Sequence, residues 1–183
     1  MSMKNSVLFW AFLLLTGCAM GGGKQDSSNV YSAPPVGSSI ELKTALTVPG
    51  GETRVYLQRG VVVTKKALDR YYPSCNFELK KLSETDRTIQ PEAFLVVRVQ
   101  PQTSEIVYHP QPLQLAGLRS AGMDGSGRPM IMRALHLWIG SDRQPDVMRL
   151  TCRGGLDDMA WASPPSIDAM RQALGGYASL ILP

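Results

Sequence analysis

Side chains that could carry out chemistry are few in this sequence, which holds three cysteines and two histidines in 183 residues. His109 stands before a proline. His136 lies in an alternating apolar stretch, on the same face as Met132, Ala134 and Trp138. A histidine among such neighbours more often packs than reacts. The sequence contains no His-Glu-x-x-His motif, Cys/His cluster or Gly-x-Ser-x-Gly elbow. We therefore expect no enzymatic activity, no bound metal and no cofactor; a cell-wall hydrolase is the least favoured alternative.

Cys18 ends the most distinctive segment of the chain. Lys4 is followed by nine apolar residues at positions 7–15, and these lead into Leu15-Thr16-Gly17-Cys18. A positive charge, a short apolar core and small residues before a cut are typical of an export signal. The apolar run is too short for a spanning helix, which needs about 20 residues. The tetrapeptide resembles the lipobox of bacterial lipoproteins.

The resemblance implies that residues 1–17 are a signal peptide and that Cys18 becomes a lipidated N-terminus carrying acyl chains such as palmitate. Several acyl chains anchor a protein stably, whereas one holds it only marginally. Because Ala19 rather than aspartate follows the cysteine, the resemblance implies an outer-membrane anchor with a periplasm-facing domain. The alternative is an ordinary secretory signal that happens to contain a cysteine.

The other two cysteines, Cys75 and Cys152, form an even remainder that suggests a disulfide in an oxidising compartment. Strand alternation places Cys75 on the face of Phe77 and Leu79, and Cys152 on the face of Met148 and Leu150. Both thiols are therefore expected in the core. Closing so long a loop should stabilise the fold by roughly 4–4.5 kcal/mol on the chain-entropy model. Two buried free thiols are the alternative.

Composition divides the chain into three parts. Residues 18–39 are rich in glycine, serine and proline and predict a flexible tether after the lipidated cysteine. Residues 40–183 are long enough for a single β-rich domain. The net charge of +4 is too small to indicate a nucleic-acid partner.

Apolar–polar alternation predicts a mainly β (α+β) fold, an antiparallel β-sandwich or open barrel with one C-terminal helix. The helix should begin at Ser163 as N-cap, bury Ile167, Met170 and Leu174, and stop at Gly175. One or two helical turns are expected over 65–72, and a polar loop over 83–91. Strands are expected over 40–48, 53–58, 61–64, 75–82, 93–100, 105–108, 130–139, 146–152 and 177–182. The strand over 93–100 should be central because it is apolar on both faces, and Pro101 should end it.

Two surface features are candidates for binding. The first is a basic stretch with tyrosines, Lys65, Lys66, Arg70, Tyr71 and Tyr72, which could meet phosphate and sugar groups; a solvated edge guarded by lysines is the alternative. The second is the irregular segment 109–129, which contains Met123 and is followed by Met130, a composition that suits adaptable contacts; a mobile insertion is the alternative.

These features together predict a membrane-anchored, non-enzymatic lipoprotein of the cell envelope. Its domain would act as a binding or structural accessory of an outer-membrane assembly, with another envelope protein as partner. The alternative is a ligand-binding or inhibitor-like module for an anionic glycan, a lipid or an incoming enzyme.

Overall fold

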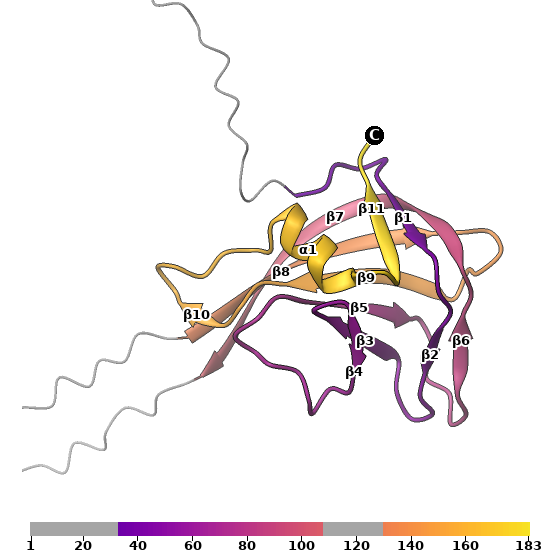
Figure 1. Cartoon of the computed structure of the whole chain (residues 1–183), viewed down its shortest axis with the longest axis horizontal. Helices are drawn as coiled ribbons and strands as arrows, with labels where there is room; N and C mark the ends of the chain where they lie inside the picture. The colour runs from indigo at the N-terminus through magenta and orange to yellow at the C-terminus, as the bar shows by residue number, and fades with distance from the viewer. Residues whose placement is uncertain (1–32, 108–129) are drawn as a thin grey trace, which may run out of the picture.

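A computed structural model describes residues 33–107 and 130–183 of the protein (Figure 1). The described residues form a curled antiparallel sheet, a half-barrel, with one helix near the C-terminus, which confirms the predicted mainly β fold. Cys18 and Met123 lie outside the described residues. The elements are β1 (Ser39–Leu42), β2 (Leu46–Val48), β3 (Arg54–Gln58), β4 (Val61–Val63), β5 (Ser74–Leu79), β6 (Arg87–Ile89), β7 (Glu92–Val107), β8 (Met130–Gly140), β9 (Val147–Arg153), β10 (Asp157–Asp158), α1 (Ile167–Leu174) and β11 (Ala178–Ile181).

The strands pair in the order β11-β1-β7-β8-β9-β5-β3-β4, with β10 paired to β8 and a separate two-stranded sheet formed by β2 and β6. Helix α1 contacts β11 at one end of the sheet and both β3 and β5 near the other end. The sheet must therefore curl so that both ends reach the helix, and its apolar face lies on the inner side. This inner face holds the core, with Ile40, Phe77, Phe94, Leu137, Leu150 and Leu174 fully buried.

The helix is fixed at both ends, although its start differs from the prediction. Ser166, not Ser163, is the N-cap, and its hydroxyl accepts from the amide of Ala169 at 3.1 Å. Pro164 and Pro165 precede the cap rather than forming the first turn. At the other end Gly175 stops the helix with a φ of 55°, and a Cβ there would lie 2.3 Å from the Cα of Gly60.

The turn between β3 and β4 is formed by Arg59 and Gly60, in the gap between the strands expected over 53–58 and 61–64. Both residues have positive φ, 52° and 76°, as a two-residue hairpin turn requires. The amide of Gly60 donates to the carbonyl of Ala173 at 3.2 Å, so this turn also docks against the end of α1.

Strand β7 departs from the prediction at Pro101, which does not end it. Pro101 pairs with Leu135, and the strand runs on to Val107, so 93–100 and 105–108 are one strand. The neighbour β1 pairs only with residues 92–95, which leaves the far side of β7 open where proline lacks its N–H. The first half of β7 lies between two other strands, as expected. However, Leu95 and Val97 are about half exposed, so only one face of this strand is buried.

Three local predictions were wrong for related reasons. The expected strand over 40–48 is split into β1 and β2, which join different sheets although the alternation of Ile40, Leu42, Leu46 and Val48 is kept. Residues 65–72 form turns instead of helix, since their backbone groups bond to Gln58. The stretch 83–91 contains β6, whose residues 87–89 pair with β2.

Cys75 and Cys152 stand directly opposite each other on β5 and β9, with sulfur atoms 2.06 Å apart, at disulfide distance. Both side chains are fully buried on the inner face, as the alternation predicted. A register shift near Glu78 puts Val147 rather than Met148 opposite Leu79, so Met148 does not share the core with Leu150.

Candidate anion-binding site

The outer face of the sheet carries polar residues on five neighbouring strands, and charged side chains meet there in register. The first row across the sheet joins Arg54 on β3, Glu78 on β5, Arg149 on β9, Trp138 on β8 and Arg98 on β7. Alternation makes this face the counterpart of the core face, because the strand neighbours Val55, Phe77, Leu137 and Leu150 are buried in the core. We call the residues Arg54, Glu78, Arg149 and Arg153 the arginine cluster.

Glu78 is the centre of the cluster and bonds to an arginine on each side. Arg54 Nη2 donates to its Oε1 at 2.7 Å, and Arg149 Nε donates to its Oε2 at 2.6 Å. Burial raises the pKa of the Glu78 carboxyl, but the hydrogen bonds from Arg54 and Arg149 outweigh it and hold the pKa below its ordinary value. The carboxylate therefore stays ionised at neutral pH, and its bond raises the pKa of Arg54.

Trp138 separates the cluster from β7 and is held between two cations. The guanidinium carbon of Arg98 lies 4.1 Å from the ring centroid, and that of Arg149 lies 5.2 Å from it. Such contacts restrict the planar guanidinium groups and fix the direction of their N–H bonds.

Arg153 lies two rows further along β9 and has no carboxylate partner among the hydrogen bonds and ion pairs of the described residues. Its Nη1 donates to the amide oxygen of Asn76, a fully buried side chain on β5. Burial lowers the pKa of the Arg153 guanidinium, and the positive charges of Arg54 and Arg149 act in the same direction. Two buried donors, Arg54 Nε and Asn76 Nδ2, have no hydrogen-bond partner within the described part of the chain.

His136 lies between these rows and is buried. Its Nε2 bonds to the Gln102 amide oxygen, which only accepts, so Nε2 carries the proton and Nδ1 accepts from the Thr151 hydroxyl at 2.7 Å. Burial lowers the pKa of His136, and the charges of Arg149 and Arg153 lower it further. The ring is therefore neutral at pH 7, and neither of its partners is a serine, a cysteine or a carboxylate.

The cluster opens into two adjoining cavities. One, of about 250 Å³, is lined by Arg54, Arg149, Arg153, His136, Gln102, Ser104, Met132 and Ala134. The other, of about 440 Å³, shares Arg54, Arg153 and Met132 and adds Tyr56, Leu68, Ser74, Lys65, Asp69 and Arg70. Gln58 holds the covering turns in place, because its amide accepts from Asp69 N at 3.0 Å and donates to the Asp69 carbonyl at 2.8 Å. A third hollow, beside Leu95 and Val97, is lined by one cationic residue, Lys80, and one acidic residue, Asp142, so charges of one sign do not gather there.

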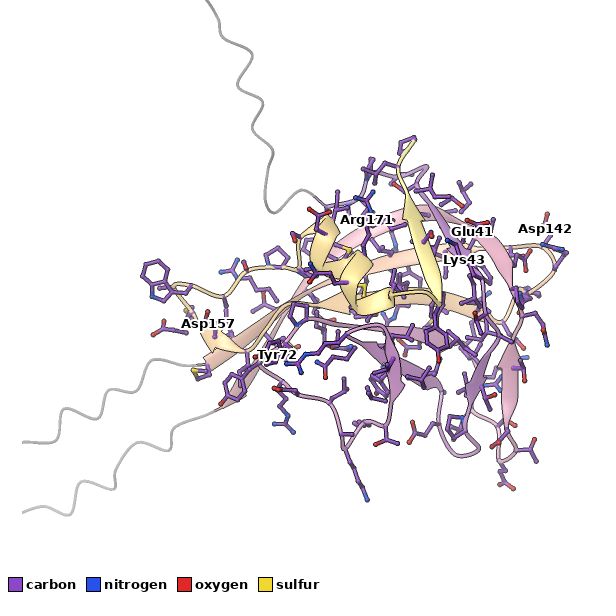
Figure 2. The ribbon with its side chains drawn as sticks, viewed as in Figure 1. Glu41, Lys43, Tyr72, Asp142, Asp157 and Arg171 are labelled. Atoms are coloured by element: carbon purple, nitrogen blue, oxygen red, sulfur yellow. A yellow bond between two sulfur atoms is a disulfide. The ribbon has the colours of Figure 1, made fainter. Side chains whose placement is uncertain are left out.

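The sequence-predicted binding residues divide between this site and the surrounding surface. Lys65 and Arg70 line the larger cavity. Lys66, Tyr71 and Tyr72 are exposed, and Arg59 stacks 3.7 Å from the Tyr72 ring. Met130 is half-buried at the start of β8, next to β10. In Figure 2 Tyr72 and Asp157 lie at the same end of the molecule, opposite Glu41, Lys43 and Asp142.

No family model, curated protein or solved structure matches this chain. Within residues 33–107 and 130–183, no three His, Cys, Asp or Glu side chains are grouped so that they could hold a metal ion. No helix of those same ranges is both long and apolar enough to cross a membrane. The site is therefore interpreted from its own geometry.

Sequence reasoning missed the arginine cluster itself. Its members carry no motif, and they are separated by 24 residues between Arg54 and Glu78 and by 71 between Glu78 and Arg149. A weak signal was present: Arg54, Tyr56 and Gln58 alternate with apolar residues, as do Asn76 and Glu78, and Arg149, Thr151 and Arg153. Such alternation also describes an ordinary solvated face, and only the strand order shows that these stretches are neighbours.

Proposed function

We propose that this protein is a lipid-anchored, periplasm-facing binding module of the cell envelope, and that its arginine cluster holds an anionic ligand. The observation that carries the proposal is the convergence of three arginines, of which only two are paired with the carboxylate of Glu78, beside cavities that open to solvent. Guanidinium groups with fixed direction match oxyanions well, because each offers parallel N–H donors.

The leader and the tether support the location of this module. A lipid on Cys18, followed by the predicted tether, would let the domain reach ligands near the outer membrane. The surroundings of His136 support binding over catalysis, because its hydroxyl partner Thr151 is only 1% exposed and its other ring nitrogen bonds to the Gln102 amide instead of an orienting carboxylate.

A second candidate function is docking to an envelope protein through an exposed apolar tip. The amide of Leu156 donates to the Arg70 carbonyl at 2.7 Å, so the two segments that carry Tyr71 and Trp161 are adjacent. Tyr71 is 66% exposed and Trp161 is 74% exposed, and aromatic residues of this kind are enriched at protein interfaces.

Site-specific photocrosslinking in intact cells tests both functions. A photoreactive residue at Ser104 reports on the arginine cluster, one at Trp161 reports on the tip, and one at Lys43 is the control on the far end of the domain. We expect a product from Ser104 that Lys43 does not give, and a protein adduct from Trp161 if the second function holds. Identical products from all three positions would contradict both functions.

The anchor is tested separately by fractionation. Replacing Cys18 with serine removes the acylated thiol, so the chain should move from the membrane fraction to the soluble periplasmic fraction. The wild-type chain should yield an N-terminal peptide whose mass includes acyl chains on Cys18. A variant that still sediments with membranes would refute the lipid anchor.

A further inference from the structure

The smaller cavity carries an unbalanced charge. Three guanidinium groups line it, and among the described residues the one carboxylate in contact with them is Glu78, which Arg54 and Arg149 share. Three cations less one carboxylate leave a charge of +2, because His136 is neutral. A charge of this size in a partly desolvated site calls for a counter-ion.

The donors that remain free also favour an oxyanion. Glu78 uses one N–H of Arg54 and one of Arg149, and Asn76 uses one N–H of Arg153, although each guanidinium has five. Arg54 Nε is buried without a partner among the described residues, and Arg54 lines both cavities. These unused groups are all donors, so a ligand that satisfies them must present several acceptors.

From this geometry we infer that the arginine cluster binds a phosphate monoester. The inference rests on the proposed binding function and names its ligand class. A phosphate monoester carries a charge of about −1.5 to −2 at pH 7 and three acceptor oxygens, which match the charge of +2 and the three guanidinium groups. A single carboxylate would neutralise only half of that charge and offer two oxygens.

The adjoining cavity indicates that the phosphate is part of an organic ester. The two cavities share Arg54, Met132 and Arg153, so they are neighbours. A ligand whose phosphate lies in the smaller cavity can therefore extend its organic part into the larger one. There Tyr56, Leu68 and Met132 provide apolar contact, while Lys65, Asp69 and Arg70 provide polar groups at the rim. This mixed lining suits a sugar ring or a lipid-linked sugar better than free inorganic phosphate.

Calorimetric titration of the full chain tests the inference with four probes at neutral pH: glucose 1-phosphate, glucuronate, glucose and inorganic phosphate. We expect glucose 1-phosphate to bind more tightly than inorganic phosphate, glucuronate to bind at least about tenfold more weakly than glucose 1-phosphate, and glucose not to bind. Raising the salt concentration should weaken binding of the phosphate ester.

Arg153→Gln is the decisive variant, with Lys43→Gln as its matched control. Both changes remove one positive charge, but Lys43 is exposed between β1 and β2 at the far end of the domain (Figure 2). Arg153→Gln should raise the Kd for glucose 1-phosphate at least about tenfold, because a hydrogen bond to a charged group is lost, while Lys43→Gln should leave it unchanged. Arg153→Lys keeps the charge without the planar fork and should fall between the two.

Several outcomes would overturn the assignment. Equal Kd values for glucuronate and glucose 1-phosphate would reject the phosphate monoester while leaving the anionic binding function standing. Inorganic phosphate binding as tightly as the ester would reject the organic part of the ligand. No binding of any anion, or equal losses in Arg153→Gln and Lys43→Gln with unchanged thermal unfolding, would reject the site and the binding function together.

Discussion

Replacing Glu78 with glutamine should lower the stability of the fold and strengthen ligand binding at the same time. The change removes the negative charge that Arg54 and Arg149 share but keeps the size of the side chain. The two arginines would then repel each other without a carboxylate between them, while the cavity charge would rise from +2 to +3. A purely structural ion pair would give only the first effect.

The expected loss of stability follows from the exposure of the three side chains. The side chain of Glu78 is 8% exposed, that of Arg149 18% and that of Arg54 37%. Exposed ion pairs contribute about 0.2–1 kcal/mol, and breaking a buried pair costs about 3–5 kcal/mol. The partly exposed arginines place this network between those limits, so we expect a loss of about 2 kcal/mol. A domain of this size should then melt about 6 °C lower.

The pH dependence has a definite sign. The pKa of Glu78 in the folded protein lies below its ordinary value of 4.5, so its contribution is fully present above that pH and is lost as the pH falls through the folded-state pKa. The difference in Tm between wild type and Glu78→Gln should be largest at pH 7 and should narrow below about pH 4.5.

Thermal unfolding followed by circular dichroism at several pH values measures this difference, with Glu41→Gln as control. Glu41 is an exposed carboxylate on β1, so removing its charge should change Tm little. The Kd of Glu78→Gln for glucose 1-phosphate should fall about fivefold, as about 1 kcal/mol of Coulomb energy at a few ångströms predicts. An unchanged Tm at pH 7, or a gap as wide at pH 3 as at pH 7, would refute the role given to Glu78.

Two further substitutions test the disulfide and the contact between the β3–β4 turn and the end of α1. Cys75→Ser should destabilise the fold by about 4 kcal/mol, because the disulfide closes a loop between residues 77 positions apart. It should also leave Cys152 reactive to thiol reagents after unfolding. Cys152→Ser should melt at the same temperature as Cys75→Ser, and unequal losses of stability would contradict a shared bond. Gly175→Ala should cost more than about 1 kcal/mol by denaturant titration, because φ is +55° and the new Cβ would meet the Gly60 Cα. Gly176→Ala is its control, since a Cβ there meets nothing within 4 Å, and equal losses in both variants would argue against the Gly60–Gly175 contact.

The parts of the fold that follow from local alternation could be predicted from sequence. Ile40, Leu42, Leu46 and Val48, which alternate along the strand expected over 40–48, are all buried, because side chains alternate whichever sheet a strand joins. Thr44 belongs to the same alternation but is exposed, because the strand breaks there. The division into β1 and β2 could not be seen, since it depends on which partner strand pairs with each half. The strand end expected at Pro101 was wrong for the same reason. The missing N–H of a proline interrupts a sheet only where a neighbouring strand would accept from it, and β1 does not extend as far as Pro101.

The candidate site was found only at its edge. Lys65 and Arg70 stand out in the sequence because they belong to a basic run, and the structure places both beside the larger cavity. The arginine cluster is assembled by pairing β3 with β5 and β5 with β9, contacts between residues far apart in the chain. Long-range pairing of this kind leaves no local pattern.

The position of the disulfide links the arginine cluster to the redox state of the chain. Cys75 immediately precedes Asn76 on β5, and Cys152 immediately precedes Arg153 on β9, so the disulfide lies next to the hydrogen bond between Arg153 and Asn76. A newly made, reduced chain lacks this clamp between the two strands. The protein would then bind the anion only after the two thiols are oxidised. A copy in a reducing compartment would not bind phosphorylated metabolites.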